Sequence, residues 1–478
     1  MPFRSSNMFP ADKERMKLNN PGNLDEIVGE IALASTDTAH AAMTLAKEAF
    51  AGWASIPMEK RVKILHLALD HLESNKDKFA QSITLENGKP LAEAYSEVES
   101  ALGDGRFQLN QASKLPVHDQ NIQINKTISG EVWHVPMGVF LLITPWNFPL
   151  ATILRKLIPA VVWGNTAVVK PAQETPFTAI MLFEILAQAG VPADVVNLVL
   201  GKGSEIGDTL VDHPALRGIS FTGSTEVGTG ICKRIGDRNV RLQMEMGGKN
   251  ALVILNDADV DASVQAAVTA AFTCSGQWCT ATSRIIVEEG IYQTFCREFV
   301  KNVAELKMGT GMDPDVNFGP VASSRQKKVA INAIKRAKEE GAQLLCGGNA
   351  QELVNGKPGY FVEPTVFCEV TASMHLFREE IFGPVVGVTR AKNARHALQL
   401  VNDSQYGLSF SVFTTDLEKA DIFLKEVHCG MVHHNLHTAY RHPAMPIIGW
   451  KESGRGIPEC GRYARDFYTQ IKAVYRCN

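Results

Sequence analysis

Hydrophobic positions along the chain follow two different periods. Apolar residues recur at helical spacing over residues 41–53 and 59–72, where charged residues occupy the other face. The segments 138–143 and 166–170 are short and mostly apolar, as in strands that are buried on both faces. The pattern therefore predicts helices and buried strands that alternate along the chain.

The same order of strand, turn and helix continues beyond these segments. Further strands are predicted at residues 195–200, 218–222, 251–255 and 284–288, and further helices at residues 264–272 and 295–306. Strand, turn and helix in repetition indicate a parallel, doubly wound sheet. The rhythm restarts after residue 250, which indicates a second α/β unit.

Three extended segments lie outside this rhythm. Residues 121–125 and 129–134 are predicted to form a hairpin, and residues 467–475 are predicted to form a late strand. Such outlying strands either pair across subunits or remain simple edge strands, and the pattern alone favours neither alternative.

Composition is that of an ordinary globular protein and excludes several classes of function. The 478 residues are 45% hydrophobic and 21% charged, which suits two or three domains with large cores. The net charge of −3 argues against nucleic acid or an anionic membrane as a partner. The first residues lack the apolar core of a secretion signal, and no apolar run is long enough to span a bilayer.

Cysteine usage points to a reducing compartment. The nine cysteines are scattered and odd in number, and they lack the paired spacing of a metal site. We therefore expect reduced thiols in a cytoplasmic protein and no metal site, rather than a disulfide framework.

One cysteine, Cys279, stands beside residues that suit a reactive site. It follows Gly276 and Gln277, where the backbone is able to turn tightly and admit a substrate. A thiolate is a strong nucleophile that forms a covalent adduct with a carbonyl carbon. A buried structural thiol is the commoner role for an isolated cysteine, so motifs elsewhere in the chain must decide.

Two further motifs carry polar groups among apolar neighbours. Asn147 lies in the rigid loop Pro-Trp-Asn-Phe-Pro after a predicted strand, where its amide is placed to donate to a developing oxyanion. Glu245 precedes a double glycine, and burial there would raise its pKa and suit it to take a proton from water. In isolation, each residue would more simply satisfy its surroundings as a loop amide or a salt-bridged carboxylate.

Glycine-rich turns follow two of the predicted strands. Residues 201–207 and 221–228 both place glycine where a helix begins, and a helix start offers free N–H groups to phosphate. Neither turn is a complete Gly-x-Gly-x-x-Gly motif. Lys170 ends another strand, where its ammonium group would reach a ribose or remain solvated.

These pieces occur in one order, and together they resemble the aldehyde dehydrogenase superfamily. The resemblance spans residues 41–475. It rests on Pro-Trp-Asn-Phe-Pro, Phe-Thr-Gly-Ser-Thr-Glu, Glu-Met-Gly-Gly-Lys-Asn, Gly-Gln-Trp-Cys and Glu-Ile-Phe-Gly-Pro. It implies that NAD or NADP oxidises an aldehyde to an acid through a cysteine thioester. Cys279 matches the family's nucleophile, Asn147 a donor to the oxyanion, and Glu245 the residue that activates water.

The resemblance also implies cofactor contacts and an architecture. The residues expected at the cofactor are Thr144, Pro145, Trp146, Lys170, Gln173, Gly203, Gly207, Phe221, Gly223, Ser224, Glu380 and Phe382. The implied α/β fold has a doubly wound parallel-sheet cofactor domain (residues 1–116 and 137–246), an α/β catalytic domain (247–445) and a small β oligomerisation arm (117–136 and 463–478). The arm implies a homodimer or homotetramer.

Three departures from the family pattern affect these expectations. Gln173 stands where NAD-preferring members often have glutamate, and a neutral amide repels a 2′-phosphate less, so NADP stays open beside NAD. The usual Pro-Phe-Gly-Gly near the C-terminus is replaced within residues 446–454, which border the substrate mouth. The N-terminal strand common in the family is expected to be weak or absent before Asn19.

The expected substrate contacts favour an aldehyde with an acidic tail. These residues are Phe148, Arg155, Trp278, Arg284 and Arg441. Arg155 and Arg284 resemble positions in semialdehyde dehydrogenases of the succinate and 2-oxoglutarate semialdehyde types, and arginine binds a carboxylate through a planar fork. A structural ion pair is the equally weighted alternative for Arg155.

Other functions remain open at this stage. The same mechanism would serve a neutral, aromatic or sulfonated aldehyde. A coenzyme-A-acylating enzyme, a thioesterase and a non-catalytic binding protein on the same scaffold are the rivals from other classes. Glu245, Lys170 and Glu380 argue against the first two, because those enzymes would lack the base or the need for a dinucleotide.

Overall fold

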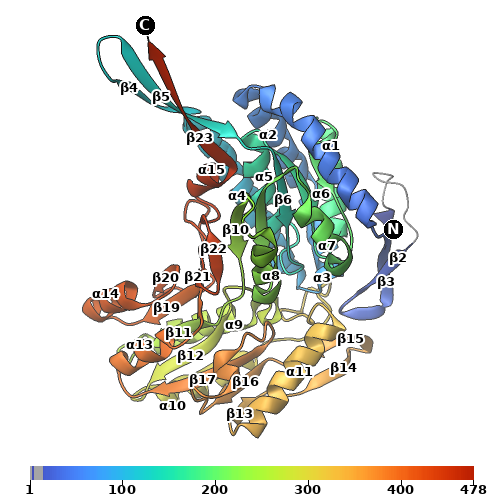
Figure 1. Ribbon diagram of the computed structural model, residues 1–478. Helices are drawn as coiled ribbons and strands as arrows, with labels where there is room; N and C mark the ends of the chain where they lie inside the picture. The colour runs from blue at the N-terminus through green and yellow to red at the C-terminus, as the bar shows by residue number, and fades with distance from the viewer. Residues whose placement is uncertain (1–2, 5–13, 478) are drawn as a thin grey trace.

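Two parallel sheets organise the chain, one above the other in Figure 1. The computed structural model describes residues 3–4 and 14–477. Over these ranges the first sheet has six strands in the order β22-β10-β9-β6-β7-β8. Their bounds are β6 Val139–Ile143, β7 Thr166–Lys170, β8 Val196–Leu198, β9 Leu216–Thr222, β10 Arg241–Glu245 and β22 Gly454–Gly456. All pair in parallel except β22, which is antiparallel to β10.

The first sheet reverses its winding at β6. Moving along the chain, β7 and β8 are added on one side of β6, and β9 and β10 on the other. A crevice forms at such a switch point, outside the carboxyl ends of the strands, and it is where doubly wound sheets bind ligands. The loops after β6 and β9, which carry Asn147 and Gly223, therefore meet at this crevice.

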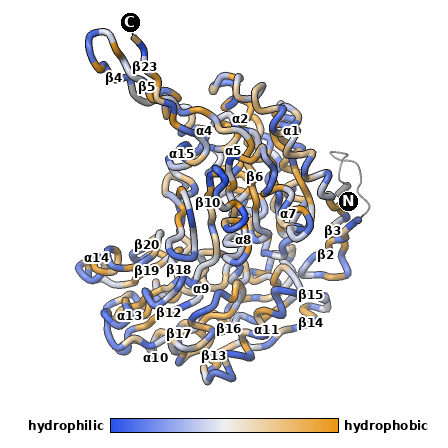
Figure 2. The backbone as a smooth tube through the Cα atoms, in the orientation of Figure 1, coloured by the Kyte–Doolittle hydropathy of each residue, from blue (hydrophilic) through white to orange (hydrophobic). Residues whose placement is uncertain are grey.

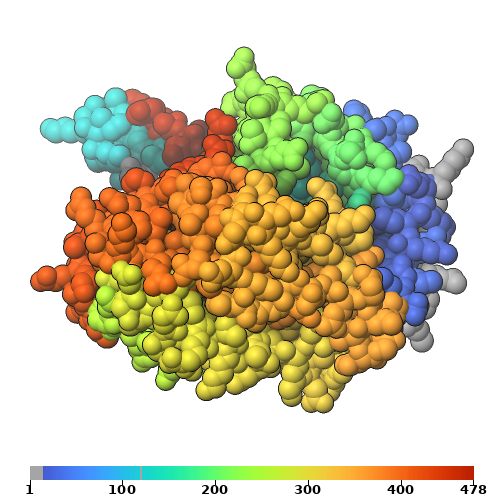
Figure 3. Space-filling view, turned by 90° about the horizontal axis from the view of Figure 1, so that it is seen from below, coloured from blue at the N-terminus to red at the C-terminus, as the bar shows by residue number. Residues whose placement is uncertain are grey.

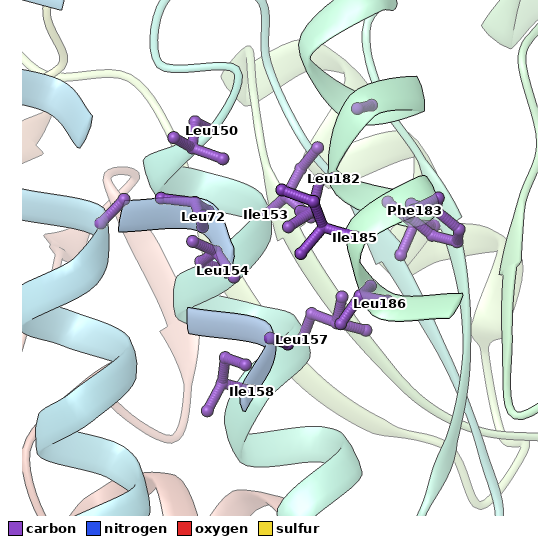
Figure 4. Packing of buried hydrophobic residues seen from close by; sticks show 14 of the residues in the cluster. Leu72, Leu150, Ile153, Leu154, Leu157, Ile158, Leu182, Phe183, Ile185 and Leu186 are labelled. Carbon is purple, nitrogen blue, oxygen red and sulfur yellow. The ribbon is translucent and has the colours of Figure 1, made fainter. Parts of the chain in front are cut away.

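Helices cover both faces of the first sheet. They are α1 Thr36–Ser55, α2 Met58–Ser74, α3 Lys76–Asn87, α4 Leu91–Lys114, α5 Ala151–Val162, α6 Phe177–Gln188, α7 Gly203–Asp212 and α8 Thr225–Ile235. Hydrophilic and hydrophobic stretches alternate along α1 and α2 in Figure 2, as the amphipathic pattern predicted. Helix α5 is buried almost throughout and packs against α4 and α2, and its side chains lie beside those of α6 (Figure 4). Ile153, Leu157 and Leu186 are among the side chains in that contact.

The second sheet has the strand order β13-β16-β17-β12-β11-β19-β20 within the described ranges. Its bounds are β11 Asn250–Ile254, β12 Thr282–Glu288, β13 Gln343–Cys346, β16 Thr365–Cys368, β17 Val385–Ala391, β19 Ser409–Phe413 and β20 Met431–His434. Its helices are α9 Val260–Phe272, α10 Tyr292–Val303, α11 Ser324–Glu339, α12 His375–Arg378, α13 Ala394–Asn402 and α14 Leu417–Glu426. Seen from below, these yellow and orange segments cover most of the molecule (Figure 3).

Short elements complete this part of the chain. They are the 3-10 helix η1 Thr273–Gly276 and the strands β14 Ala350–Val354, β15 Lys357–Val362, β18 Tyr406–Gly407 and β21 Trp450–Lys451. None of the helices in the described part of the chain is long and apolar enough to cross a membrane.

The predicted hairpin projects from the body as an arm (Figure 1). It comprises β4 His118–Gln123 and β5 Ile128–Pro136, and β23 Thr469–Cys477 pairs antiparallel with β5. The late strand was predicted two residues too early. Phe467 and Tyr468 end helix α15 (Tyr463–Tyr468), because both rings are buried against Phe140 of the first sheet.

The N-terminal strand expected to be weak or absent is present, so that prediction is wrong. Strands β1 Phe3–Arg4, β2 Arg15–Asn20 and β3 Asn23–Ala32 form a sheet in the order β1-β3-β2. Backbone pairing between β2 and β3, with Leu18 buried, stabilises a segment whose polar sequence hides its strand character. The domain boundaries stay a prediction, and β22 adds residues to the first sheet that those boundaries left unassigned.

Candidate active site

A cavity of about 1170 Å³ lies between the two sheets. Its walls come from the carboxyl ends of the first sheet and from loops of the second. Asn147 follows β6, Glu245 ends β10, and Cys279 precedes β12; all three line this one cavity. The structure therefore brings together the three residues predicted to perform the chemistry.

A strained turn places the Cys279 loop. Cys274, Ser275 and Gly276 have successive φ values of 53°, 54° and 69°, which is a left-handed conformation that side chains rarely adopt. A Cβ at Gly276 would lie 2.4 Å from the carbonyl oxygen of Gly383, so glycine is required there. Such a turn persists only where its surroundings fix it, and strain of this kind is typical of functional sites.

The Asn147 amide is tied to the same loop. Asn147 is 4% exposed, and its Nδ2 donates a hydrogen bond to the carbonyl oxygen of Gln277 at 2.8 Å. Gln277 is two residues before Cys279. An amide nitrogen carries two hydrogens, so one N–H group holds the nucleophile loop and the other remains available to a ligand.

The Glu245 carboxyl group is buried and incompletely bonded. Glu245 is 7% exposed, and its Oε2 has no hydrogen-bond partner. Burial raises the pKa of Glu245 well above its ordinary value, and the negative charge of Glu459 adds to this, whereas Lys156 and Arg155 act in the opposite direction. A carboxyl group with a raised pKa is a stronger base in its ionised form, which suits it to take a proton from water.

The Cys279 thiol is protonated at neutral pH in this structure. Burial raises its pKa to about 12, and the positive charge of Arg155 only partly offsets that effect. Nearby carboxyl groups at Glu380 and Glu245 raise it further. Formation of the thiolate therefore requires a proton acceptor or a change of surroundings on ligand binding.

Buried polar atoms around the cavity lack partners. These atoms are Thr144 Oγ1, Gln173 Oε1, Thr222 Oγ1 and Glu245 Oε2. Buried polar groups are normally hydrogen-bonded, so this set fits a polar ligand that supplies the missing bonds. A dinucleotide offers ribose hydroxyls, phosphates and an amide as hydrogen-bonding groups, and they are spread over a length comparable to that of the cavity.

Two helices begin at the cavity wall. Helix α7 begins at Gly203, and α8 begins at Thr225 after the N-cap Ser224, whose Oγ accepts from the Val227 N–H. The positive ends of helices attract phosphate. A Cβ at Gly223 would lie 2.6 Å from the Phe221 ring, so glycine keeps the backbone close to the site.

Glu380 and Phe382 complete this wall from the second sheet. Glu380 Oε1 accepts a hydrogen bond from the Gly248 N–H at 2.9 Å, and burial raises the pKa of Glu380 to about 7. A Cβ at Gly247 would approach Glu380 Oε2 to 2.2 Å. Phe382 packs edge-on against Trp146 at 5.5 Å between ring centroids. Each of the twelve residues predicted to contact the cofactor lines the cavity.

Charged side chains gather elsewhere on the cavity wall. Arg155 Nε lies 3.3 Å from Asp104 Oδ2, and an Arg155 terminal nitrogen lies 3.6 Å from Glu459. Arg441 binds the same Asp104 carboxylate with both terminal nitrogens, at 2.8 and 2.5 Å. Arg155 and Arg441 both line the cavity, while Asp104 is buried between them.

The model of the aldehyde dehydrogenase family matches residues 9–474. The chain belongs to the aldehyde dehydrogenase family. This membership confirms the predicted resemblance, the fold class and the expectation of an oxidoreductase that uses NAD or NADP.

Individual members of the aldehyde dehydrogenase family are similar over nearly the whole chain. Alpha-ketoglutaric semialdehyde dehydrogenase of Bacillus subtilis (strain 168) is 36% identical over 97% of this chain and 94% of its own. 2,5-Dioxopentanoate dehydrogenase of Saccharolobus solfataricus is 40% identical over 95% of each chain. A crystal structure of betaine aldehyde dehydrogenase from Staphylococcus aureus in complex with NAD+ has a TM-score of 0.93 at 32% identity, over 97% of this chain and 92% of that chain.

One residue that was predicted to contact the substrate of this aldehyde dehydrogenase lies away from the cavity. Arg284 is 3% exposed and is not among the residues that line the cavity. Its guanidinium group donates to the carbonyl oxygens of Lys249, Leu400 and Val401. The prediction that Arg284 contacts the substrate is therefore wrong. Arg284 braces β12, and its closeness to Cys279 in sequence was misleading.

Aromatic side chains stand beside the nucleophile in this aldehyde dehydrogenase. Phe148 and Trp278 both line the cavity, with ring centroids 5.1 Å apart. The carboxylates of Asp104 and Glu459 orient Arg155 and Arg441. Asp104 and Glu459 were not predicted from the sequence, because they lie outside the family motifs. A polar residue at a helical core position, as Asp104 is in α4, was the available signal for the first of these.

Proposed function

We propose that this chain oxidises a semialdehyde with a carboxylate tail to the corresponding diacid, with NAD or NADP as the oxidant. The observation that carries the proposal is the paired guanidinium groups of Arg155 and Arg441 on the cavity wall. With the buried Lys156, which binds Glu459 at 2.6 Å, the cluster holds three cations beside the carboxylates of Asp104 and Glu459 and the nearby carboxyl group of Glu245. A planar guanidinium group on the cavity wall is suited to bind a carboxylate tail.

The relatives support the same class of substrate. The names of the two relatives, alpha-ketoglutaric semialdehyde dehydrogenase and 2,5-dioxopentanoate dehydrogenase, describe one compound, an aldehyde with a 2-oxo acid at its far end. We therefore place 2-oxoglutarate semialdehyde first and succinate semialdehyde second. A sulfonated tail carries the same charge and belongs in the test.

The proposed reaction begins at the Cys279 sulfur. The Cys279 thiol first gives its proton to the Glu245 carboxylate, which lines the same cavity and passes the proton on to solvent. The thiolate then forms a bond to the aldehyde carbon, and the carbonyl electron pair moves to oxygen. The free N–H group of Asn147 donates to that oxygen, while its other N–H group stays on the Gln277 carbonyl. Developing charge is thus met by a donor that is already fixed, so little reorganisation is needed.

Oxidation and hydrolysis follow. A nicotinamide cofactor bound in this cavity would supply the acceptor for the hydride that leaves the former aldehyde carbon. The product on the protein is a thioester on Cys279. Glu245 then takes a proton from water as the water oxygen attacks the thioester carbon, and the C–S bond breaks to release the acid. The Glu245 Oε2 atom, buried and without a partner, is suited to that proton transfer.

The cavity between the two sheets is proposed to hold the cofactor. Glu380 and Lys170 would bind the two riboses, and the helix starts at Gly203 and Thr225 would face the phosphates. Burial lowers the pKa of Lys170, and Glu174 opposes that effect. Gln173 offers no charge against a 2′-phosphate, so NADP competes with NAD at this position.

Assembly and location are part of the same proposal. The arm strand β23 exposes Ile471 and Tyr475 at 70% and 73%, which is unusual for large apolar side chains. We expect this surface to be covered in a homodimer or homotetramer. A cytoplasmic location is supported by the scattered, odd set of cysteines in the sequence.

An aldehyde panel tests the proposal directly. Each compound is assayed by cofactor reduction at 340 nm, with NAD and NADP in turn, and products are analysed with and without coenzyme A. We expect kcat/KM for the semialdehydes to exceed that for neutral aldehydes of equal length by at least about tenfold, with the free acid as product. Equal kcat/KM across the panel would reject the acidic tail, and an acyl-coenzyme A product would reject hydrolysis.

A further inference from the structure

A buried ion pair lies directly behind the active-site loop. Lys89 and Glu97 are joined by a contact of 2.7 Å between Nζ and Oε2, and both side chains are essentially inaccessible. Neither residue lines the cavity. A buried pair costs desolvation energy, so its retention calls for a structural or functional reason.

The ammonium group of this pair holds the residue that carries the proposed oxyanion donor. Lys89 Nζ donates to the backbone carbonyl oxygen of Asn147 at 2.7 Å. It also lies 4.0 Å from the centre of the Phe148 ring, the next residue in the loop. Asn87, two residues before Lys89, donates to the carbonyl oxygen of Trp146 at 3.1 Å.

The carboxylate of the pair holds the other end of the same loop. Glu97 Oε1 accepts from the backbone N–H groups of Leu150 and Ala151, at 2.9 and 3.2 Å. These groups start helix α5, whose first N–H groups have no partner within the helix. One ion pair therefore fixes both ends of the turn that presents the Asn147 side chain.

The helix that carries Glu97 also contacts the nucleophile turn. Glu93 Oε2, one turn before Glu97 in α4, accepts from the Cys274 N–H at 2.9 Å. Cys274 begins the left-handed turn that leads to Cys279. Helix α4 is therefore a common support for loops that come from the two different sheets.

We propose that Lys89 and Glu97 are positioning residues that set the Asn147 amide against the Cys279 sulfur. They touch neither substrate nor cofactor, and they act through the backbone of the turn. The inference goes beyond the proposed substrate, but it rests on the proposed role of Asn147. A displacement of catalytic groups by about 1 Å costs on the order of 100-fold in rate, so small movements of this turn matter.

The test uses the full-length enzyme and the double variant Lys89→Met/Glu97→Gln. The double change removes both charges of the pair, and glutamine keeps an oxygen for the Leu150 and Ala151 N–H groups. Glu93 also loses the nearby charge of Lys89, but burial raises its pKa to about 7, so its carboxyl group is able to become neutral. We expect kcat to fall at least about tenfold, while KM for the aldehyde and Kd for NAD change less than about threefold. This split follows because the pair supports a transition-state contact rather than ground-state binding.

A double-mutant cycle separates positioning from general damage. In an Asn147→Ala background, the same double change should lower kcat less than about twofold, because the group that it positions is already gone. A loss of kcat that is equally large in both backgrounds would overturn the inference. An Asn147→Ala variant with normal kcat would instead overturn the proposed role of Asn147.

Two further variants complete the design. If the double variant does not fold, Lys89→Arg takes its place, because arginine keeps a cation for Glu97. Arginine moves the group that donates to the Asn147 carbonyl oxygen, so kcat should fall at least about threefold. This loss should again be seen only where Asn147 is present. Glu86→Gln is the matched control, since the buried Glu86 carboxylate accepts from the Phe177 and Thr178 N–H groups and reaches no active-site loop. Its kcat should stay within twofold of wild type. Folded Lys89 variants with wild-type kcat would refute the proposal.

Discussion

Replacement of Arg155 by methionine separates tail recognition from general effects on the active site. Arg155 lies 3.3 Å from Asp104 and 3.6 Å from Glu459. Both carboxylates keep another cation in the variant, because Asp104 still binds Arg441 and Glu459 still binds Lys156. No buried carboxylate is left unpaired, so we expect Arg155→Met to fold.

The expected magnitude follows from the bonds that Arg155 already makes. A hydrogen bond to a charged group contributes about 1.5–3 kcal/mol. Arg155 is shared with two carboxylates, so the lower value applies to its contact with a substrate. Since about 1.4 kcal/mol corresponds to tenfold in affinity, KM for a semialdehyde should rise roughly tenfold. KM for a neutral aldehyde of equal length should change less than about twofold.

Steady-state kinetics with matched substrates provide the assay. Succinate semialdehyde is compared with butanal at saturating NAD. Arg155 also lowers the pKa of the Cys279 thiol, so kcat should fall for both aldehydes, and the ratio of the two KM changes is the diagnostic quantity. Arg234→Met serves as a control, because Arg234 lines the cavity from α8 and pairs with Asp212. Equal KM changes for both aldehydes would refute carboxylate binding by Arg155.

Three other substitutions have defined outcomes. Asn147→Ala should lower kcat by about 10²–10³-fold with cofactor affinity retained, measured by stopped-flow and by fluorescence titration with NAD. Glu245→Gln should lower kcat by about 10²–10⁴-fold. Burial raises the pKa of Glu245, and only the ionised carboxylate takes a proton from water. The kcat of the wild-type enzyme should therefore rise as pH increases through the raised pKa of Glu245, and the Glu245→Gln variant should not show this rise. Gly247→Ala should displace Glu380 and raise KM for NAD several-fold, whereas unchanged KM would show that Glu380 is not held as described.

The sequence predicted the elements whose signal is local. The strand at residues 166–170 was predicted with its observed bounds, and the strand predicted at residues 138–143 begins one residue later, because apolar runs mark strands that are covered on both faces. The late strand was predicted to begin two residues too early. Phe467 and Tyr468 are apolar because they end helix α15 in the core, and not because they belong to the strand. Exposed and more buried residues alternate along β2, but Met16 and Leu18 are its only apolar residues, so the pattern was too short to predict a strand.

The residues of the candidate site likewise fall into those that local motifs predict and those that only tertiary contacts define. Cys279, Asn147 and Glu245 were found because each belongs to a motif of several residues, and the structure brings them to one cavity. Lys89 and Asp104 were missed because the groups that they bind, the Asn147 carbonyl and Arg441, are distant in sequence. Lys89 lies in the short link between α3 and α4, and the neighbours of Asp104 are ordinary helix residues. Contacts between remote buried charges are set by tertiary packing, which periodicity does not encode.

The first sheet is completed only late in translation, because its edge strand β22 lies near the C-terminus. The ribosome releases β10 long before β22, which pairs with it, and Glu459 follows β22 directly. Until that segment emerges, one edge of the nascent sheet stays open, and the buried Lys156 lacks its counter-ion. Truncated translation products should therefore be sensitive to proteases and inactive, even though they already contain the nucleophile.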